Sequence, residues 1–286
     1  MQLKNLFALT PAILLVLTVT SCTAPAVEKN IGIQLYSVRD HMKSNPDSTV
    51  TEVGKMGYKF VEAAGYSDGK FYGMSPVDFK ALVEKSGMQF LGSHTGQSLP
   101  DSANWESTMI WWDNAIAAHK EAGVKWIVQP WMGAEGYESL DGLKKYCDYF
   151  NAVGEKCNAA GIRFGYHNHD KEFSQVDSVT IYDFMLENTD PAKVMFQLDL
   201  YWIAVGGADP IAYFDKYPGR FEIYHVKDEK ELGGDETMMN FEPSFAAADK
   251  AGMKNYVVEV ERYSFDPMVS IQKSAEFLMN SAFVTK

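Results

Sequence analysis

The sequence is poor in cysteine, in positive charge and in glycine-rich phosphate-binding motifs. Only three cysteines occur in 286 residues, so no disulfide framework holds the fold. The 26 Lys and Arg residues are outnumbered by 38 Asp and Glu, and the net charge of −12 argues against a nucleic-acid partner. No Gly-x-Gly-x-x-Gly or P-loop motif follows an apolar segment, which weakens the case for a nucleotide-binding fold.

Apolar material is abundant by contrast. Hydrophobic residues make up 46% of the chain and aromatic residues 13%, which is enough for one large core. A length near 250 residues is typical of an eight-fold α/β barrel. The composition therefore favours one large globular domain.

The first segment has the features of an export signal. Lys4 precedes an apolar run from Leu6 to Val19, and small residues then lead to Cys22. We predict that residues 1–21 are a lipoprotein-type signal peptide, that Cys22 is lipidated, and that residues 22–30 form a tether. The protein is then exported and lipid-anchored in the bacterial cell envelope, in the periplasm or on the cell surface. The alternative is an ordinary cleaved signal.

The other two cysteines, Cys147 and Cys157, lie ten residues apart in one predicted helix, Leu140–Ala160. A helical rise of about 1.5 Å per residue separates them by ~15 Å, beyond the ~7 Å limit for a disulfide. We predict free, buried thiols.

One junction recurs along residues 31–286, in which a helix-like stretch ends, a glycine follows and an apolar strand begins. Glycine suits the end of a helix because it enters the left-handed conformation without steric cost. The five positions are Gly57, Gly87, Gly123, Gly161 and Gly252. Their spacing is typical of repeated βα units.

Eight strands are predicted between these helices. They are Ile31–Tyr36, Tyr58–Ala63, Gln89–His94, Trp126–Trp131, Arg163–His169, Val194–Asp199, Phe221–Val226 and Tyr256–Glu261. The clearest helices are Val77–Lys85, Trp105–Ala122, Leu140–Ala160, Val179–Asn188, Pro243–Ala251 and Pro267–Met279. Alternating strands and helices predict a single α/β domain over residues 31–286, a closed (β/α)8 TIM barrel. A doubly wound open sheet is the alternative.

Polar side chains gather at the predicted C-terminal ends of the strands, which form the active face of such a barrel. They are Glu62, His94, Gln129, His167, His169, Asp199, His225, Lys227, Glu259 and Glu261. Burying so many ionisable groups in one mouth is costly unless they pair or bind a metal. The set as a whole therefore indicates an active site.

Several of these segments resemble the xylose isomerase-like TIM barrel superfamily, the sugar phosphate isomerase/epimerase group. The resemblance covers roughly Ile31 to Met279. Its most specific parts are residues 32–40, GIQLYSVRD; 165–170, GYHNHD; 198–202, LDLYW; 225–228, HVKD; and 258–261, VEVE. It implies a divalent cation held by Asp199, His225 and Glu259, with a fourth ligand from strand five.

Strand five departs from the pattern of many sugar epimerases, which have a Glu before the Asn. This chain has His167 before Asn168, so a two-Glu proton shuttle is in doubt. We predict His167 as the metal ligand and His169 as an acid/base or substrate contact, although the two share a face. The ligand set suits Mn²⁺, Mg²⁺, Co²⁺ or Zn²⁺ without selecting among them.

The remaining roles follow from residue type. Glu259, on the same strand face as Glu261, is predicted to be catalytic as well as a ligand, and Lys227 to stabilise an enolate or to pair with Asp228. The predicted substrate contacts are Glu62, His94, Gln129, Trp131, Trp202 and Glu261. Aromatic rings near the same loops suit sugar C–H faces, although about half of them are expected to pack the core.

Three functions remain open. The first is a metal-dependent isomerase or epimerase that moves a proton next to a carbonyl of an unphosphorylated sugar, since no basic cluster appears at the rim. The second is a lyase, hydratase or hydrolase acting on keto-sugars or keto-glycosides with the same metal site. The third is a non-catalytic surface sugar-binding barrel. The expected partner is a small-molecule sugar, membrane contact is expected only through the lipid anchor, and homo-oligomerisation is left open.

Overall fold

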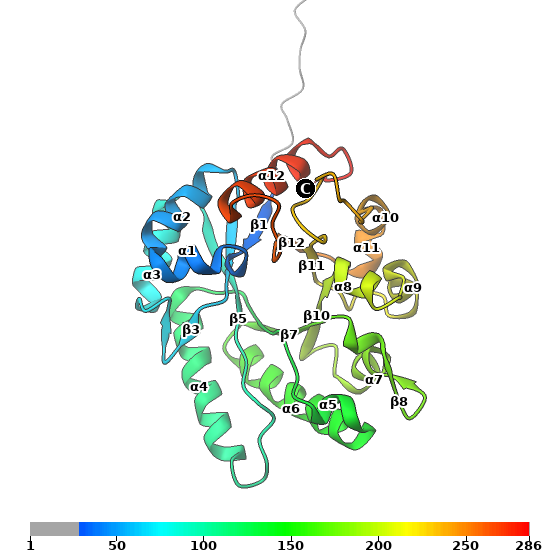
Figure 1. Cartoon of the computed structure of the whole chain (residues 1–286). Coiled ribbons are helices and arrows are strands. Elements are labelled where there is room, and N and C mark those ends of the chain that lie inside the picture. Colours follow the sequence, from blue (N-terminus) through cyan, green and yellow to red (C-terminus); the bar gives the residue numbers. More distant parts are fainter. Residues whose placement is uncertain (1–28, 286) are drawn as a thin grey trace, which may run out of the picture.

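The computed structural model describes residues 29–285 and shows a closed barrel of eight parallel strands surrounded by helices (Figure 1). The barrel strands are β1 (Ile31–Gln34), β2 (Phe60–Ala63), β5 (Gln89–His94), β6 (Trp126–Gln129), β7 (Arg163–His167), β10 (Val194–Asp199), β11 (Ile223–Val226) and β12 (Asn255–Val258). Each strand pairs with its neighbour in chain order, and β1 pairs with β12 to close the sheet. The predicted barrel is confirmed, whereas the predicted signal peptide and Cys22 lie outside the described residues.

The helices lie around the outside of the barrel (Figure 1). They are α1 (Arg39–Ser44), α2 (Pro46–Lys55), α3 (Pro76–Lys85), α4 (Trp105–Ala122), α5 (Glu135–Glu138), α6 (Leu140–Ala159), α7 (Ile181–Asn188), α8 (Leu200–Val205), α9 (Pro210–Lys216), α10 (Glu242–Ala246), α11 (Ala248–Ala251) and α12 (Pro267–Asn280). Short 3₁₀ turns, η1 (Leu35–Val38) and η2 (Lys171–Phe173), follow β1 and β7. Two small antiparallel ribbons pair β3 (Tyr66–Ser67) with β4 (Lys70–Phe71) and β8 (Gln175–Val176) with β9 (Val179–Thr180). None of the helices in residues 29–285 has the length and apolar character needed to cross a bilayer.

Local sequence signals explain where several helices begin. Four helices start with a proline at the first position, preceded by a residue whose side chain accepts a backbone N–H of the first turn. These capping residues are Asn45, Ser75, Asp209 and Asp266. Proline fits there because its missing N–H would have no partner inside the helix anyway.

The five predicted glycine junctions all adopt the left-handed conformation. Their φ angles lie between 77° and 95°, at Gly57, Gly87, Gly123, Gly161 and Gly252. A residue with a Cβ is strained at such angles, so these glycines stop each helix and redirect the chain.

Element bounds differ from the predictions at several ends. β1 ends at Gln34 rather than Tyr36, because the backbone turns there into a 3₁₀ segment, and β7 ends at His167 rather than His169, because the backbone bends there. β6 stops before Pro130, which has no N–H to continue the ladder. The predicted helix Pro243–Ala251 is divided into α10 and α11 at Ala247.

The lower interior of the barrel is filled by aromatic and aliphatic side chains. Phe60 and Trp126 meet edge to face with ring centroids 5.8 Å apart. They fit because glycines lie beside them: a Cβ on Gly32 would come within 2.2 Å of the Phe60 ring, and one on Gly92 within 2.0 Å of Trp126 Nε1. The barrel is thus a packed core that supports the polar layer above it.

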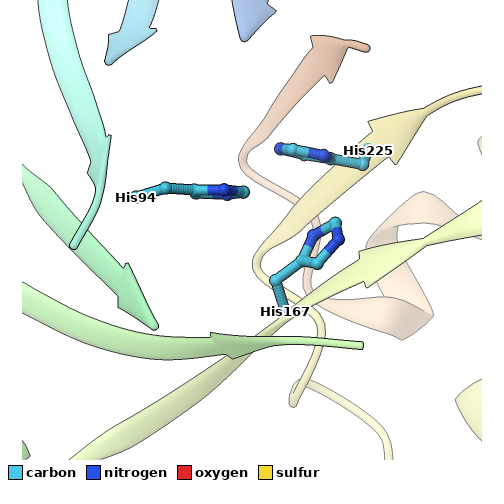
Figure 2. Close-up of side chains that lie close together, drawn as sticks. All are labelled: His94, His167 and His225. Atoms are coloured by element: carbon cyan, nitrogen blue, oxygen red, sulfur yellow. The ribbon is translucent and has the colours of Figure 1, made fainter. Parts of the chain in front are cut away.

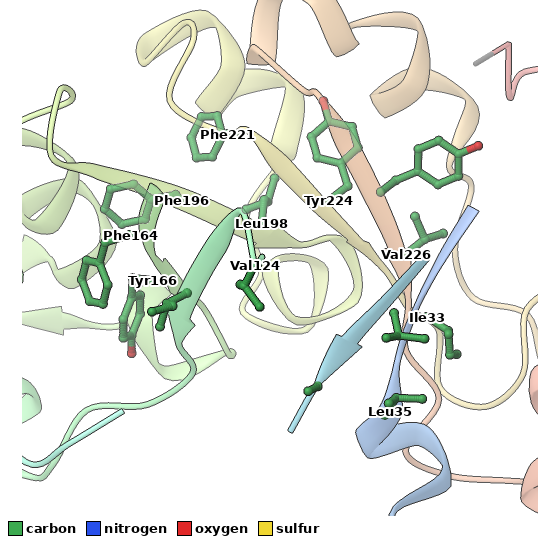
Figure 3. Close-up of a cluster of buried hydrophobic side chains, with 14 of the residues drawn as sticks. Ile33, Leu35, Val124, Phe164, Tyr166, Phe196, Leu198, Phe221, Tyr224 and Val226 are labelled. Atoms are coloured by element: carbon green, nitrogen blue, oxygen red, sulfur yellow. The ribbon is translucent and has the colours of Figure 1, made fainter. Parts of the chain in front are cut away.

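Outward-facing strand residues form a second core against the helices. Figure 3 shows Phe164 and Tyr166 of β7, Phe196 and Leu198 of β10, and Tyr224 and Val226 of β11 in this cluster. Because strand side chains alternate, the residues between them point into the barrel. Cys147 and Cys157 are buried in α6 and unpaired, as predicted.

Candidate active site

Four ionisable side chains meet at the C-terminal end of four adjacent strands. They are His167 of β7, Asp199 of β10, His225 of β11 and Glu259, which follows β12. One potential ligand atom from each lies within 4.8 Å of the others, and all four side chains are buried. We call them the ligand cluster. These four side chains lie together because, in the alternation of side chains along each strand, each of them points into the barrel.

Asp199 has a buried carboxylate oxygen that is free to bind a cation. Its Oδ1 accepts hydrogen bonds from the backbone N–H groups of Tyr201 and Trp202 and so caps α8. Its Oδ2 is fully buried and has no hydrogen-bond partner. Burial raises the pKa of Asp199 to about 7. A buried carboxylate oxygen without a partner is costly, and a cation beside it would remove that cost.

His167 is oriented to offer a lone pair to the same place. Its Nδ1 lies 3.1 Å from Gln197 Oε1, and its Nε2 lies 3.9 Å from Asp199 Oδ2. Because an amide oxygen only accepts, Nδ1 carries the proton and Nε2 is free to bind a metal. Burial, together with the positive charge of His225, lowers the pKa of His167 well below its usual value, so the ring is neutral.

His225 is held between two carboxylates. Its Nε2 lies 2.8 Å from Glu62 Oε1, and its Nδ1 lies 3.3 Å from Glu259 Oε2. Burial alone would lower its pKa, but these two carboxylates raise the pKa of His225 to about 10. In this charged ring Nε2–H donates to Glu62 and Nδ1 faces Glu259 in the ligand cluster, so a cation bound there would displace the Nδ1 proton. Figure 2 shows the rings of His94, His167 and His225 converging, and the His167 and His225 centroids are 4.6 Å apart.

Glu62 lies beneath the ligand cluster rather than in contact with the pocket. It is completely buried, and five donors surround its two oxygens. These are Gln34 Nε2, His94 Nε2, Trp126 Nε1, Gln197 Nε2 and His225 Nε2, at 2.6–3.1 Å. The sequence predicts Glu62 as a substrate contact, but it has no exposed surface, does not line the cavity and is surrounded by protein donors.

Two functional residues were missed by the sequence analysis. Gln197 connects Glu62 to the rings of His94 and His167, through Nε2 at 2.9 Å and Oε1 at 2.7 and 3.1 Å. A lone amide in the apolar strand β10, two residues before Asp199, was the available signal. Glu172 is buried and accepts the His169 N–H at 2.9 Å, and its place in a loop gave no such signal.

Lys227 links the two glutamates that follow β12. Its Nζ lies 2.8 Å from Glu261 Oε2 and 3.9 Å from Glu259 Oε2. Burial would raise the pKa of Glu259, but Lys227 and His225 lower it to about 2. The alternative pairing of Lys227 with Asp228 is not present, because the Asp228 carboxylate accepts the backbone N–H groups of Glu229, Met238 and Met239.

A cavity of about 340 Å³ opens beside the ligand cluster. Its lining residues are Tyr36, Ala64, His94, Thr95, Gly96, Pro130, Trp131, His167, His169, Glu259 and Glu261. Of the predicted contacts, His94, His169, Trp131 and Glu261 therefore face the cavity. No Lys or Arg belongs to this lining. A larger cavity of about 770 Å³ lies between residues 231–236 and α12, away from the ligand cluster.

Two other predicted contacts lie off this lining. Gln129 lies on the same face of β6 as Ile127, so it points away from the barrel axis. Its side-chain amide donates to the Gln97 and Trp131 carbonyls. Trp202 is half-buried beside the mouth, with the His169 ring 5.7 Å away and Lys227 Nζ 5.6 Å from its own ring centroid.

The fold and the site define a (β/α)8 barrel with a histidine- and carboxylate-rich centre at the C-terminal ends of its strands. The chain belongs to the xylose isomerase-like TIM barrel family, whose model matches residues 50–281. This confirms the family that the sequence motifs suggested.

Two kinds of relative accompany this match. A sugar phosphate isomerase/epimerase from Parabacteroides distasonis has 34% identity and a TM-score of 0.84, with 93% of this chain and 98% of that one covered. Inosose dehydratase from Lacticaseibacillus casei has 30% identity over 101 residues, and the one from Geobacillus kaustophilus has 20% over 196 residues. These matches cover 35% and 64% of this chain. They span only 33% and 61% of the dehydratases.

Proposed function

We propose that this protein is a metal-dependent enzyme that removes a proton from the carbon next to a carbonyl of an unphosphorylated keto-sugar. The observation that carries the proposal is the ligand cluster, with the unpartnered Asp199 Oδ2 at its centre. Two imidazoles and two carboxylates suit Mn²⁺, Co²⁺, Zn²⁺ or Mg²⁺. His167, Asp199, His225 and Glu259 would hold the ion, and when bound it would polarise a substrate carbonyl and acidify the neighbouring C–H bond.

The chain's own residues then move the proton. Glu259 is held ionised by Lys227 and His225, and its position on the β12 side of the cavity makes it the proposed base. Lys227 lies behind Glu259 and Glu261 rather than in the cavity lining, and its positive charge stabilises these two carboxylates. His169 lies on the β7 side, where its backbone is fixed by Glu172, and it can donate a proton to an oxygen of the substrate.

This arrangement favours an elimination. The carboxylates Glu259 and Glu261 follow β12, whereas the cavity-lining His94 of β5 and His169 after β7 come from strands across the barrel. Elimination needs a base for carbon and an acid for the departing oxygen, which are different groups acting at different atoms. The curated relatives named as inosose dehydratases support the same class of reaction.

Isomerisation or epimerisation is the second candidate. It begins with the same proton removal, and the similarity to a sugar phosphate isomerase/epimerase supports it. It requires a group that returns the proton to carbon, for which His169 is the available residue. The cavity lining has carboxylates and no cationic side chain, which supports a substrate without phosphate.

The lipid anchor remains a proposal beside the catalytic one. The signal-like segment and Cys22 favour an exported protein held in the cell envelope. An exported enzyme meets sugars that have not been phosphorylated, which agrees with the acidic cavity.

Metal reloading combined with NMR in D₂O tests the proposed function. The metal-stripped protein is reloaded with Mn²⁺, Co²⁺, Zn²⁺ or Mg²⁺ and incubated with keto- and aldo-sugars. Elimination gives an unsaturated ketone and a released alcohol or water, whereas epimerisation gives deuterium at one carbon of an intact sugar. Turnover that survives complete metal removal contradicts the proposal. Binding without any exchange identifies a sugar-binding barrel instead.

A further inference from the structure

The cavity extends over the half of the mouth that the ligand cluster leaves open. The cluster occupies the ends of β7, β10, β11 and β12, which are contiguous in the barrel. Apart from His169 and Glu261, the remaining lining comes from the ends of the other four strands, β1, β2, β5 and β6. A substrate whose reacting carbon lies at the cluster therefore has space to extend across to this second half.

Two half-exposed aromatic rings flank that second half. Tyr36 follows β1 and is 42% exposed, and Trp131 follows β6 and is 40% exposed. The two strands are separated by β2 and β5 in the barrel order, so the rings lie on opposite sides of this part of the cavity. Single exposed aromatics are common on protein surfaces, whereas these two line the same cavity.

Both aromatic residues are held by neighbouring groups. The Arg39 guanidinium lies 4.7 Å from the Tyr36 ring centroid and donates to Tyr263 Oη at 2.7 Å and to the Tyr36 carbonyl at 3.2 Å. The backbone of Trp131 is fixed by the Gln129 amide, which donates to its carbonyl at 3.0 Å. Because the Tyr36 ring is already packed against Arg39, it loses little conformational entropy when a ligand packs on it.

We propose that Tyr36 and Trp131 form a second subsite, which holds a ring joined to the keto-sugar through oxygen. The substrate class is then a keto-glycoside, with a second sugar or an aromatic alcohol as the departing group. Both present a flat face with C–H or π character, which aromatic side chains bind. This inference rests on the proposed function and specifies its substrate.

The elimination balances without any co-reactant. The base takes the proton from the carbon next to the carbonyl, and the electron pair of that C–H bond becomes the C=C bond. The bond between the next carbon and the linking oxygen breaks, and its electron pair stays on oxygen. That oxygen takes one proton and leaves as an alcohol, so the products are an unsaturated ketone and the ring-bearing alcohol.

Binding of glycosides that lack the ketone tests the subsite without requiring catalysis. The probes are methyl glucoside, phenyl glucoside and a glucose disaccharide, added to the Mn²⁺-loaded full chain and followed by saturation-transfer NMR and calorimetry. Aromatic packing contributes about 0.5–1.5 kcal/mol, which corresponds to roughly two- to tenfold in affinity. We expect phenyl glucoside or the disaccharide to bind tighter than methyl glucoside by that factor, and the tighter of the two identifies the departing group.

Matched variants assign the effect to the rings. Trp131→Ala and Tyr36→Ala are each expected to remove most of the difference between ring-bearing and methyl probes. Trp105→Ala is the control, since Trp105 is 41% exposed and does not line the cavity. Equal affinity for all three probes, or a preference that survives Trp131→Ala and Tyr36→Ala, overturns the subsite. Failure of the proposed function appears separately, as ring-dependent binding without proton exchange on any keto-glycoside.

Discussion

Glu62→Gln perturbs the group that orients the ligand cluster. Oε2 of Glu62 accepts from Trp126 and Gln197, and Oε1 accepts from Gln34 and His225. His94 Nε2 lies 3.1 Å from Oε1 but is closer to Gln197 Oε1. Whichever oxygen becomes an NH₂ group, at least two buried donors then face another donor. Each unpaired buried donor costs about 1–3 kcal/mol, so the free energy of unfolding should fall by about 2–6 kcal/mol.

The neighbouring amides cannot compensate for this change by rotating. Gln34 Oε1 already accepts the Tyr36 N–H at 3.1 Å, and Gln197 Oε1 accepts from His94 and His167. His225 Nε2–H then faces either an NH₂ group or a neutral amide oxygen in place of a carboxylate, so Mn²⁺ affinity should fall about 10- to 100-fold. Urea unfolding of the metal-free protein and calorimetric titration with Mn²⁺ measure the two effects.

Glu222→Gln is the matched control for Glu62→Gln. Glu222 is also buried and paired, with Arg163 at 2.8 Å and Lys254 at 2.8 Å, but it lies at the other end of the barrel, where the strands begin. It should lower stability without changing Mn²⁺ affinity. If Glu62→Gln binds Mn²⁺ as tightly as the wild type, Glu62 does not orient the ligands and the reasoning is refuted.

Three further predictions follow from the same site and from the N-terminal segment. Glu259→Gln should weaken Mn²⁺ binding and lower kcat by at least about 100-fold, because it removes a ligand and a base. Glu261→Gln should lower kcat by less. Equal losses of kcat in steady-state assays would contradict these roles. The pKa of Asp199 is about 7 in the folded protein and 3.8 in an unperturbed side chain, so between these pH values the folded state keeps a proton that the unfolded chain loses. The free energy of unfolding of the metal-free wild type should therefore fall, relative to that of Asp199→Asn, as the pH rises from about 4 to 7. Denaturation at fixed pH measures this loss, Mn²⁺ should abolish it, and parallel curves without metal would contradict the burial of an unpaired carboxyl. Cys22→Ser should move the protein from the membrane fraction to the soluble fraction, and a wild type without lipid by mass spectrometry would refute the anchor.

The barrel could be predicted from the sequence because its signals are local. Glycine caps, apolar strands and Pro-containing helix starts recur in each unit, and they identify the elements without any knowledge of contacts. Strand ends were less predictable, since β1 and β7 turn away two residues early. Side chains continue to alternate between inward and outward directions beyond β12, so Glu259 and Glu261 both face the cavity as predicted.

The roles of individual side chains depended on contacts between strands. Glu62 was visible as a polar strand end, but its burial comes from donors on β1, β5, β6, β10 and β11. Gln129 alternates with the β6 side chains that point into the barrel, so it points away from the mouth. Its position near the end of a predicted strand did not reveal this direction. Glu172 contacts the His169 backbone because the chain turns back after β7, and no periodic sequence pattern predicts such a contact.

Anomalous diffraction from crystals loaded with Mn²⁺ tests the central claim most directly. We predict one strong peak at the ligand cluster, within bonding distance of His167 Nε2, Asp199 Oδ2, His225 Nδ1 and a carboxylate oxygen of Glu259. A peak held by His169 in place of His167 would correct one ligand. Crystals that show no peak among these four residues at saturating Mn²⁺ would contradict the account.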